Sequence, residues 1–315
     1  GVGKNTFMRE IGKTMEQAGA DVEYLWCSGD PDSLDGVAIP AIRCAVCDGT
    51  SPHIVEPKYP AAVDRYVDLG RFYDLPAAKA QAAEVKRHTH DYQDAYARAY
   101  RCLKAARQVE LDTAAEIRQC FDSQRAARRI SGIMARELRG RGTGTGRITR
   151  RFLGSVTHKG PVWRFDSAET LCSKIYELED SYEQAGGLLS ALCAEAVRRS
   201  YDVIACPSPE EPERLEHLLI PELGVAFVTS KPGMEYPGKP YRRVRLDALS
   251  HPESKARLRF RSRMAGVLRE EGVAALQDAK AAHDRLESVY NPYVDFEGVR
   301  AQAAIEAGRL LSWLN

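Results

Sequence analysis

Apolar residues recur along the chain at spacings that distinguish helices from strands. Four of them share one face of a predicted helix: Phe7, Met8, Ile11 and Met15. The helix should end near Gly19, because glycine accepts the left-handed conformation of a helix cap. Strands are predicted at residues 22–26 and 42–47, with a loop rich in Asp, Gly, Pro and Ser at 28–36. This order of elements predicts a βαβ-type arrangement with a parallel sheet.

Long helical segments follow this first region. Residues 76–138 contain no proline after Pro76 and carry apolar side chains at helical spacing, which predicts two long helices. Residues 175–178 alternate as a strand does, and the pattern is helical again after residue 250. Residues 139–151 are rich in Gly, Thr and Arg, which predicts a solvated basic linker. Phosphate contact by its arginines is the alternative.

The chain also repeats itself, without gaps, when Asp21 is aligned with Asp202. We call this alignment the repeat register. Further identical pairs in it include Val22 and Val203, Pro31 and Pro212, Leu34 and Leu215, Ile39 and Ile220, Pro40 and Pro221, and Ala45 and Ala226. A duplicated domain is the simplest cause. We therefore predict two domains, at residues 1–138 and 152–315, joined by the linker at 139–151.

A glycine-rich turn opens the first predicted helix and has the composition of a phosphate-binding loop. In such loops, backbone N–H groups surround the phosphates and a lysine bridges the β- and γ-phosphates. The pattern Gly-x-Gly-Lys-x-Thr fits this design, and the positive end of the helix dipole lies behind the anion. The predicted nucleotide-binding residues are Gly1, Val2, Gly3, Lys4, Asn5 and Thr6.

Asp48 follows the predicted strand at 42–47 and suits the carboxylate that holds the metal ion in a P-loop enzyme. We predict Lys4 and Asp48 as catalytic residues, and Thr6 and Asp48 as Mg²⁺ ligands. The position after the lysine is usually Ser or Thr, but here it is Asn5. An amide oxygen is a poorer Mg²⁺ ligand than a hydroxyl in this geometry, so ATP binding is better supported than Mg²⁺ binding.

The repeat serves as an internal comparison for these residues. Ala185 stands opposite Lys4, and Thr229 stands opposite Asp48. The second copy has therefore lost both groups, which supports a joint role for them in the first. A turn role for Asp48, before Gly49, is the alternative.

The composition limits the cellular location and the classes of binding partner expected for the protein. The formal net charge is +1, so no global charge excess draws the protein to nucleic acid or anionic lipid. No stretch approaches the roughly 18 apolar residues of a membrane-spanning helix. The eight cysteines lie in apolar segments, which favours buried free thiols and a cytoplasmic location. Cys44 and Cys47 are expected to pack in the core rather than bind zinc, because a spacing of three places them on opposite strand faces.

Three segments resemble a family of bacterial tandem P-loop ATPase-like proteins: residues 1–12, 21–40 and 48–53. The likeness continues through residues 219–226 and the closing helices. It implies an α/β fold of two tandem P-loop NTPase-like three-layer domains, each with a parallel sheet and long helices after it. ATP is the implied ligand, the second domain is a degenerate copy, and the chain is expected to begin within the first Walker A loop.

These observations leave three functions open. The leading hypothesis is an ATP-binding P-loop protein, with ATP hydrolysis left open. The alternatives are a non-catalytic interaction protein with decayed nucleotide folds, and a small-molecule or nucleotide kinase. A protein partner or an oligomer is left open as well, and nucleic acid is not indicated beyond the basic linker.

Overall fold

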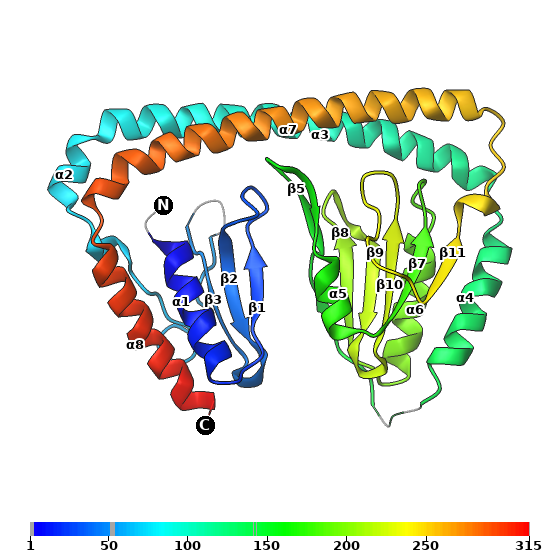
Figure 1. Ribbon diagram of the computed structural model, residues 1–315, viewed down its shortest axis with the longest axis horizontal. Helices are drawn as coiled ribbons and strands as arrows, with labels where there is room; N and C mark the ends of the chain where they lie inside the picture. The colour runs from blue at the N-terminus through cyan, green and yellow to red at the C-terminus, as the bar shows by residue number, and fades with distance from the viewer. Residues whose placement is uncertain (1–2, 51–53, 141, 143, 315) are drawn as a thin grey trace. The chain divides into compact units, whose positions relative to one another are not determined.

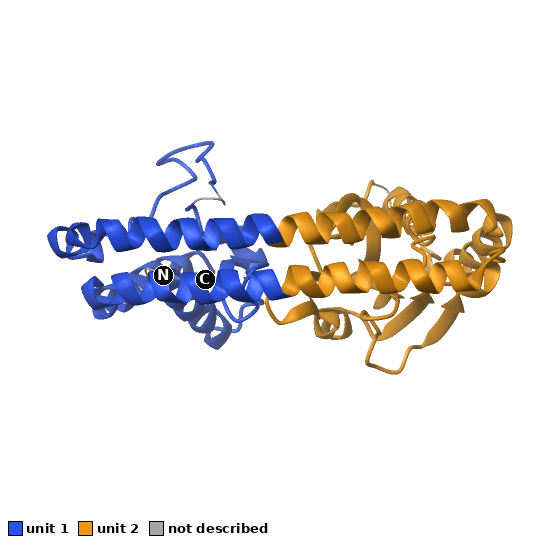
Figure 2. Ribbon diagram, turned by 90° about the horizontal axis from the view of Figure 1, so that it is seen from above, with its two compact units in different colours: residues 1–98, 274–315 blue, residues 99–273 orange. Residues whose placement is uncertain are grey.

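The protein forms two compact units. The computed structural model describes residues 3–50, 54–140, 142 and 144–314 (Figure 1). Unit 1 comprises residues 1–98 and 274–315, and unit 2 comprises residues 99–273 (Figure 2). The division falls within two long helices, α3 (Ala82–Gln119) and α7 (Lys255–Tyr290), so each of these helices contributes to both units.

Unit 1 contains a small sheet and two helices that pack on it. The strands are β1 (Glu23–Trp26), β2 (Leu34–Ile39) and β3 (Cys44–Cys47), and the helices are α1 (Lys4–Gln17) and α8 (Phe296–Leu314). The order is β1-β2-β3, and both pairings are antiparallel. The predicted helix and both predicted strands are confirmed. The predicted parallel sheet is wrong here, because β2, whose first three residues fall in the predicted loop at 28–36, lies between β1 and β3 and pairs antiparallel with both.

The core of unit 1 lies between this sheet and its two helices. The face of α1 predicted from the sequence is buried against β2 and α8. The core includes Phe7, Met8, Ile11, Met15, Leu34, Val37, Ile39, Val299, Ala303 and Leu310. Gly19 follows the end of α1 with a φ of 84°, as a left-handed cap requires. In the sequence, two short helices come between β3 and α3: η2 (Gly70–Phe72) and α2 (Leu75–Ala80).

Unit 2 is built on a six-stranded mixed sheet. Its strands are β4 (Ile148–Arg150), β7 (Lys174–Glu179), β8 (Val203–Ser208), β9 (Glu211–Ile220), β10 (Val225–Ser230) and β11 (Arg242–Arg245). The order is β11-β7-β10-β9-β8-β4. Only β9 is antiparallel to its neighbours, and the remaining pairings are parallel. A separate hairpin joins β5 (Gly154–Thr157) and β6 (Gly160–Trp163).

Helices cover both faces of the six-stranded sheet. The helices α4 (Ser123–Glu137) and α6 (Gly186–Arg198) share a core with one face, and α5 (Phe165–Leu171) packs on the other (Figure 1). Strand residues alternate between the two: in β7, Tyr176 and Leu178 join the first core and Ile175 joins the second. Unit 2 is therefore a three-layer α/β unit.

The predicted repeat is present in the pairing of the strands. Equivalent cross-strand pairs are Tyr24–Val37 and Ala205–Leu218, and Val37–Val46 and Leu218–Phe227. In both units a short helix joins the last two of these strands, η1 (Pro40–Ile42) in unit 1 and η3 (Pro221–Leu223) in unit 2. The sequence match therefore extends to the pairing of the strands in the sheets.

One backbone position of the repeat offers a test of strain. Arg43 and its counterpart Gly224 both adopt the left-handed conformation, with φ of 53° and 60°. A residue with a Cβ pays roughly 1–2 kcal/mol for this conformation, partly offset by the greater unfolded-state entropy of glycine. We expect Arg43→Gly to raise the free energy of unfolding by about 0.5–1 kcal/mol and Gly224→Ala to lower it by about 1 kcal/mol. Urea unfolding measures both, and a destabilising Arg43→Gly would contradict the assignment.

Each unit takes one of its covering helices from the segment that follows the other sheet in the sequence. The helix α4 comes after the first sheet, yet it packs on α6 in unit 2. The helix α8 comes after the second sheet, yet it packs on α1 in unit 1. The prediction that long helices follow each sheet is confirmed, but which sheet they cover was not predictable from their apolar spacing.

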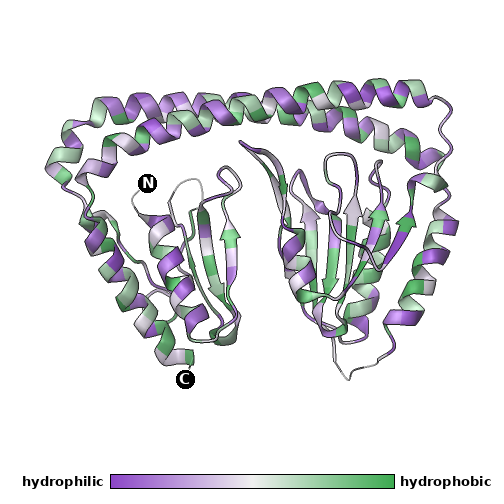
Figure 3. Ribbon diagram, in the orientation of Figure 1, coloured by the Kyte–Doolittle hydropathy of each residue, from purple (hydrophilic) through white to green (hydrophobic). Residues whose placement is uncertain are grey.

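The predicted domain limits, 1–138 and 152–315, differ from the division into compact units. Within the predicted linker, residues 148–150 form β4 and pair with β8. The long helices α3 and α7 mix hydrophilic and hydrophobic residues along their length (Figure 3). Across the described parts of the chain, no helix combines the length and apolar character needed to cross a membrane.

Candidate functional site

The turn before α1 has the backbone geometry of a glycine-dependent loop. Gly3 caps the helix with a φ of 80°, a left-handed conformation that glycine adopts without strain. A Cβ at this position would also lie 3.0 Å from Cγ1 of Val299 in α8. The predicted loop residues Gly1 and Val2 lie outside the described residues. The described part of the turn therefore requires a glycine directly before Lys4.

Lys4 and Asp48 lie together at the start of α1. The Lys4 Nζ is 3.0 Å from Asp48 Oδ2 and donates a hydrogen bond of 2.7 Å to Thr50 Oγ1. The Thr50 N–H and hydroxyl both donate to Asp48 Oδ1, at 2.8 and 2.7 Å. Burial alone would raise the pKa of Asp48, but the hydrogen bonds from Thr50 and the charge of Lys4 outweigh it and lower that pKa. The two residues singled out from the sequence thus form one charged cluster, with Thr50 as an additional member.

Asn5 has a structural contact that the sequence did not indicate. Its Oδ1 accepts hydrogen bonds from the backbone N–H of Leu34, at 3.2 Å, and from Nε of Arg9, at 3.0 Å. The side chain therefore fastens the first turn of α1 to the start of β2. Thr6 lies in the same helical turn and is half-buried. Its role as a Mg²⁺ ligand stays a prediction.

Within the described part of the chain, Asp48 belongs to no group of three acidic, histidine or cysteine side chains that could hold a metal ion. Among these residues, one group brings three such ligand atoms within 4.8 Å of one another, and it comprises His283, Asp284 and Glu287 of α7. These three residues lie on a single helix and are partly or fully exposed. Any Mg²⁺ at Asp48 would therefore rely on hydroxyl groups, phosphate oxygens and water for its other ligands.

All eight cysteines are free thiols. The spacing prediction for β3 holds, since Cys44 is half-buried and Cys47 is exposed. The expectation that both pack in the core is wrong for Cys47, because one face of β3 is left uncovered. Burial, and next the neighbouring Asp48 carboxylate, raise the pKa of the Cys47 thiol, which disfavours a reactive thiolate.

In unit 2 the helix equivalent to α1 is α6, and a carboxylate binds the loop before it. Asp180 directly follows β7, and its two carboxylate oxygens accept hydrogen bonds of 2.7 Å from the N–H groups of Gln184 and Ala185. Asp180 is buried, with only 3% of its surface exposed. Burial is the largest influence and raises the pKa of Asp180 to about 6. Two of the backbone N–H groups that an anionic ligand at the start of α6 would use are thus already bound by the protein's own side chain.

A second carboxylate of this loop, Glu183, is the centre of a buried ion cluster. It lies in the left-handed conformation with a φ of 58°. Arg107 of α3 donates two hydrogen bonds to it, of 2.7 and 2.8 Å. Lys231 and Arg214 lie 3.1 and 3.3 Å from Glu183 Oε1. Burial would raise the pKa of Glu183, but Lys231, Arg214 and Arg107 outweigh it and lower that pKa to about 2.

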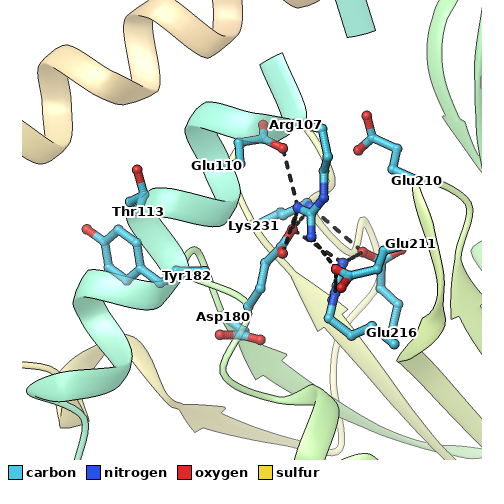
Figure 4. Close-up of polar contacts among 12 residues, drawn as sticks. Arg107, Glu110, Thr113, Asp180, Tyr182, Glu210, Glu211, Glu216 and Lys231 are labelled. Atoms are coloured by element: carbon cyan, nitrogen blue, oxygen red, sulfur yellow. Dashed lines mark hydrogen bonds and ion pairs between the residues drawn. The ribbon is translucent and has the colours of Figure 1, made fainter. Parts of the chain in front are cut away.

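Three further carboxylates balance the charge of this cluster (Figure 4). Glu216 lies 3.3 Å from Arg214 and 3.7 Å from Lys231, Glu211 pairs with Arg107, and Glu110 lies 3.6 Å from Arg107. Three cations therefore face four carboxylates. Burying charges in this way is tolerated because each ion has partners of the opposite sign.

The repeat shows where the charges of the two units differ. In the repeat register, Lys231 stands opposite Thr50, so unit 2 carries a lysine at the end of β10 in place of the one at the helix start. Glu216 and Glu211 stand opposite Asp35 and Asp30. The sequence reading missed Lys231, although the same alignment contains the signal two positions beyond Thr229.

Comparisons of the chain with protein-family models, with curated proteins and with solved structures find no match. The resemblance to tandem P-loop proteins therefore stays a prediction. The contacts at the two helix starts differ: Lys4 and Asp48 face each other in unit 1, whereas in unit 2 Asp180 binds the loop and Arg107 binds Glu183 of that loop.

Proposed function

We propose that unit 1 binds a nucleoside triphosphate at the start of α1, with Lys4 as the phosphate ligand. The observation that carries the proposal is the cluster of Lys4, Asp48 and Thr50 beside a glycine cap. A lysine at a helix start places a mobile positive charge next to free backbone N–H groups, a combination suited to phosphate. In this proposal both sheets derive from one P-loop-like domain, and ATP is the ligand.

Asp48 has two roles in this proposal. Without ligand, its carboxylate holds the Lys4 ammonium, and both side chains are partly shielded from water, with exposures of 11% and 30%. With ligand, phosphate oxygens replace the carboxylate as the partner of Lys4. Asp48 and the nearby hydroxyl groups are oxygen donors of the kind that Mg²⁺ prefers, so the residues present fit that ion.

Unit 2 has a supporting role in this proposal. The start of α6 is bound by Asp180, and Ala185 supplies no charge where Lys4 does in unit 1. A triphosphate would have to displace a buried carboxylate from two hydrogen bonds. Unit 2 therefore binds no nucleotide, and its ion cluster stabilises the loop instead.

Calorimetric titration with ATP and Mg²⁺ tests the proposal. We expect the full chain to bind ATP, and Lys4→Ala to weaken binding about 10- to 100-fold, because a charge-assisted hydrogen bond contributes about 1.5–3 kcal/mol. Asp48→Asn should reduce the dependence of binding on Mg²⁺. Lys13→Ala, which removes an exposed lysine of the same helix, is the matched control and should bind as the unaltered protein does.

Two results would contradict this function. The unaltered protein showing no heat of binding with any nucleoside triphosphate would favour the alternative of a non-catalytic interaction protein. Equal affinity in Lys4→Ala and the unaltered protein would remove Lys4 from the site. If the unaltered protein binds ATP, release of inorganic phosphate would indicate an ATPase, and transfer of phosphate to an acceptor would indicate a kinase.

A further inference from the structure

In both units, a cation on a long helix pairs with an acid at the same position of the repeat. In unit 2, Arg107 of α3 pairs with Glu211. In unit 1, Lys280 of α7 lies 3.6 Å from Asp30. Asp30 and Glu211 stand opposite each other in the repeat register and so occupy equivalent places. Two independent helices have therefore acquired the same contact to the same part of the duplicated unit.

The helix segments themselves are also alike in sequence. Lys104, Ala105 and Ala106 precede Arg107, and the same three residue types recur at Lys280, Ala281 and Ala282. Lys280 is thus about one helical turn from the position equivalent to Arg107 and lies along the same helix face. The likeness between α3 in unit 2 and α7 in unit 1 is therefore one of helix face and of charge, with the two cations one helical turn apart.

Arg107 shows what this cation does in the second copy. It binds three carboxylates: Glu110 of its own helix, Glu211 of β9, and Glu183 of the loop that precedes α6. Glu183 stands opposite Val2 in the repeat. The sequence of unit 1 therefore has the apolar Val2 at the repeat position where unit 2 has Glu183, the loop carboxylate that binds Arg107.

Lys280 also pairs with a carboxylate of its own helix, as Arg107 does with Glu110. It is hydrogen-bonded to Asp284, whose side chain is 52% exposed. Exposed pairs four residues apart on a helix contribute little to stability, so this partner is readily exchanged. The Asp30 pair is more shielded, with side-chain exposures of 27% and 28%.

The loop that carries Asp30 lies beside the first turns of α1. Arg9 donates a hydrogen bond to the carbonyl oxygen of Asp32, and Asn5 accepts one from the N–H of Leu34. These contacts tie the loop to the turn that contains Lys4. Lys280 is therefore held next to the segment that borders the proposed phosphate site.

We propose that Lys280 contacts the terminal phosphate of the bound nucleoside triphosphate, which takes the place that Glu183 has beside Arg107 in unit 2 and displaces Asp284. This inference rests on the proposed nucleotide function of unit 1. Lys4 binds the phosphates from the helix start, and Lys280 binds the last one from α7. The residue that distinguishes a triphosphate from a diphosphate thus lies at the opposite end of the sequence from the loop.

The test compares the binding of ATP and ADP, each with Mg²⁺, by calorimetry on the full chain. We expect Lys280→Ala to weaken ATP binding about tenfold and to leave ADP binding unchanged, because ADP lacks the phosphate concerned. Asp284→Ala should strengthen ATP binding about two- to threefold, since it removes the competing carboxylate. Lys86→Ala, at an exposed lysine of α3 within unit 1, is the control and should change neither affinity.

The outcomes separate this inference from the proposed function. If the unaltered protein binds neither nucleotide, both are overturned. If it binds both, and Lys280→Ala leaves the ratio of ATP to ADP affinity unchanged, Lys280 only ties α7 to the loop and this inference alone fails. A loss of ATP affinity with ADP affinity retained supports it, because a merely structural tie would affect both nucleotides alike.

Discussion

Replacing Glu183 with glutamine is expected to lower the free energy of unfolding of unit 2 by about 3–5 kcal/mol at pH 7. The substitution keeps the shape of the side chain but removes the charge that Arg107, Arg214 and Lys231 share. The three cations would then lose the one carboxylate that all of them contact. Because the Glu183 and Arg107 side chains are each 8% exposed, water cannot compensate for the lost partner.

Chemical unfolding followed by circular dichroism measures this effect. Glu213→Gln is the control, because Glu213 lies on the nearby strand β9 and is exposed. We expect the control to change stability by less than about 0.5 kcal/mol. A Glu183→Gln protein as stable as the control would show that the cluster contributes no net stability.

The effect of Glu183→Gln should also depend on pH. The pKa of Glu183 is lowered from its ordinary value of 4.5 to about 2 in the folded protein. A lowered pKa stabilises the folded state above the unfolded-state value, and this stabilisation is lost as the pH falls through the folded-state value. The difference between the unaltered protein and Glu183→Gln should therefore be constant above about pH 5 and shrink between pH 4.5 and 2.

Replacing Asp180 with alanine is expected to lower the free energy of unfolding by about 2–4 kcal/mol. The change leaves the N–H groups of Gln184 and Ala185 without their acceptor at the start of a buried helix. The effect should be smaller than that of Glu183→Gln, because the cost of burying the Asp180 carboxylate, visible in its raised pKa, disappears as well.

Amide hydrogen exchange locates this effect. The N–H groups of Gln184 and Ala185 should exchange faster in Asp180→Ala, while those of the central strand β10 keep their protection. Asp112→Ala removes an exposed carboxylate of α3 and is the matched control. Unchanged exchange at both loop amides would mean that another group, or water, replaces Asp180.

The two helix starts show two solutions to the same electrostatic problem. A helix start with a glycine-rich turn attracts an anion because its backbone N–H groups have no partners within the helix. Unit 2 supplies that anion from its own chain, through Asp180. Unit 1 holds a lysine there, paired with Asp48, and in the proposed function a phosphate replaces this carboxylate as the partner of Lys4.

Local features followed from the sequence alone. The apolar face of α1 and its end near Gly19, the strands β1, β3 and β7, and the helical character of residues 76–138 all depend on spacing within a single element. The meeting of Lys4 and Asp48 was also predictable, since both lie next to elements whose order was evident. The repeat alignment predicted more than single elements, because residues aligned in it form equivalent cross-strand pairs in the two units.

The direction of the strands did not follow from the sequence. A two-residue alternation identifies a strand but is the same for parallel and antiparallel pairing. The strand β2 was also overlooked, and without it the first sheet was assigned the wrong strand direction. Likewise, the apolar stripe of α8 fits any apolar surface of similar width. Only the tertiary structure places it on α1.

The ion cluster of unit 2 depended most on tertiary structure. Arg107 and Glu183 are 76 residues apart, and neither belongs to a motif that indicates an ion pair. Charged residues are ordinarily exposed, and whether one is buried depends on partners that distant segments provide. The sequence by itself determined the helices, most strands and the duplication. The tertiary structure decided which charges meet, because burial and pairing of ions are properties of several segments packed together.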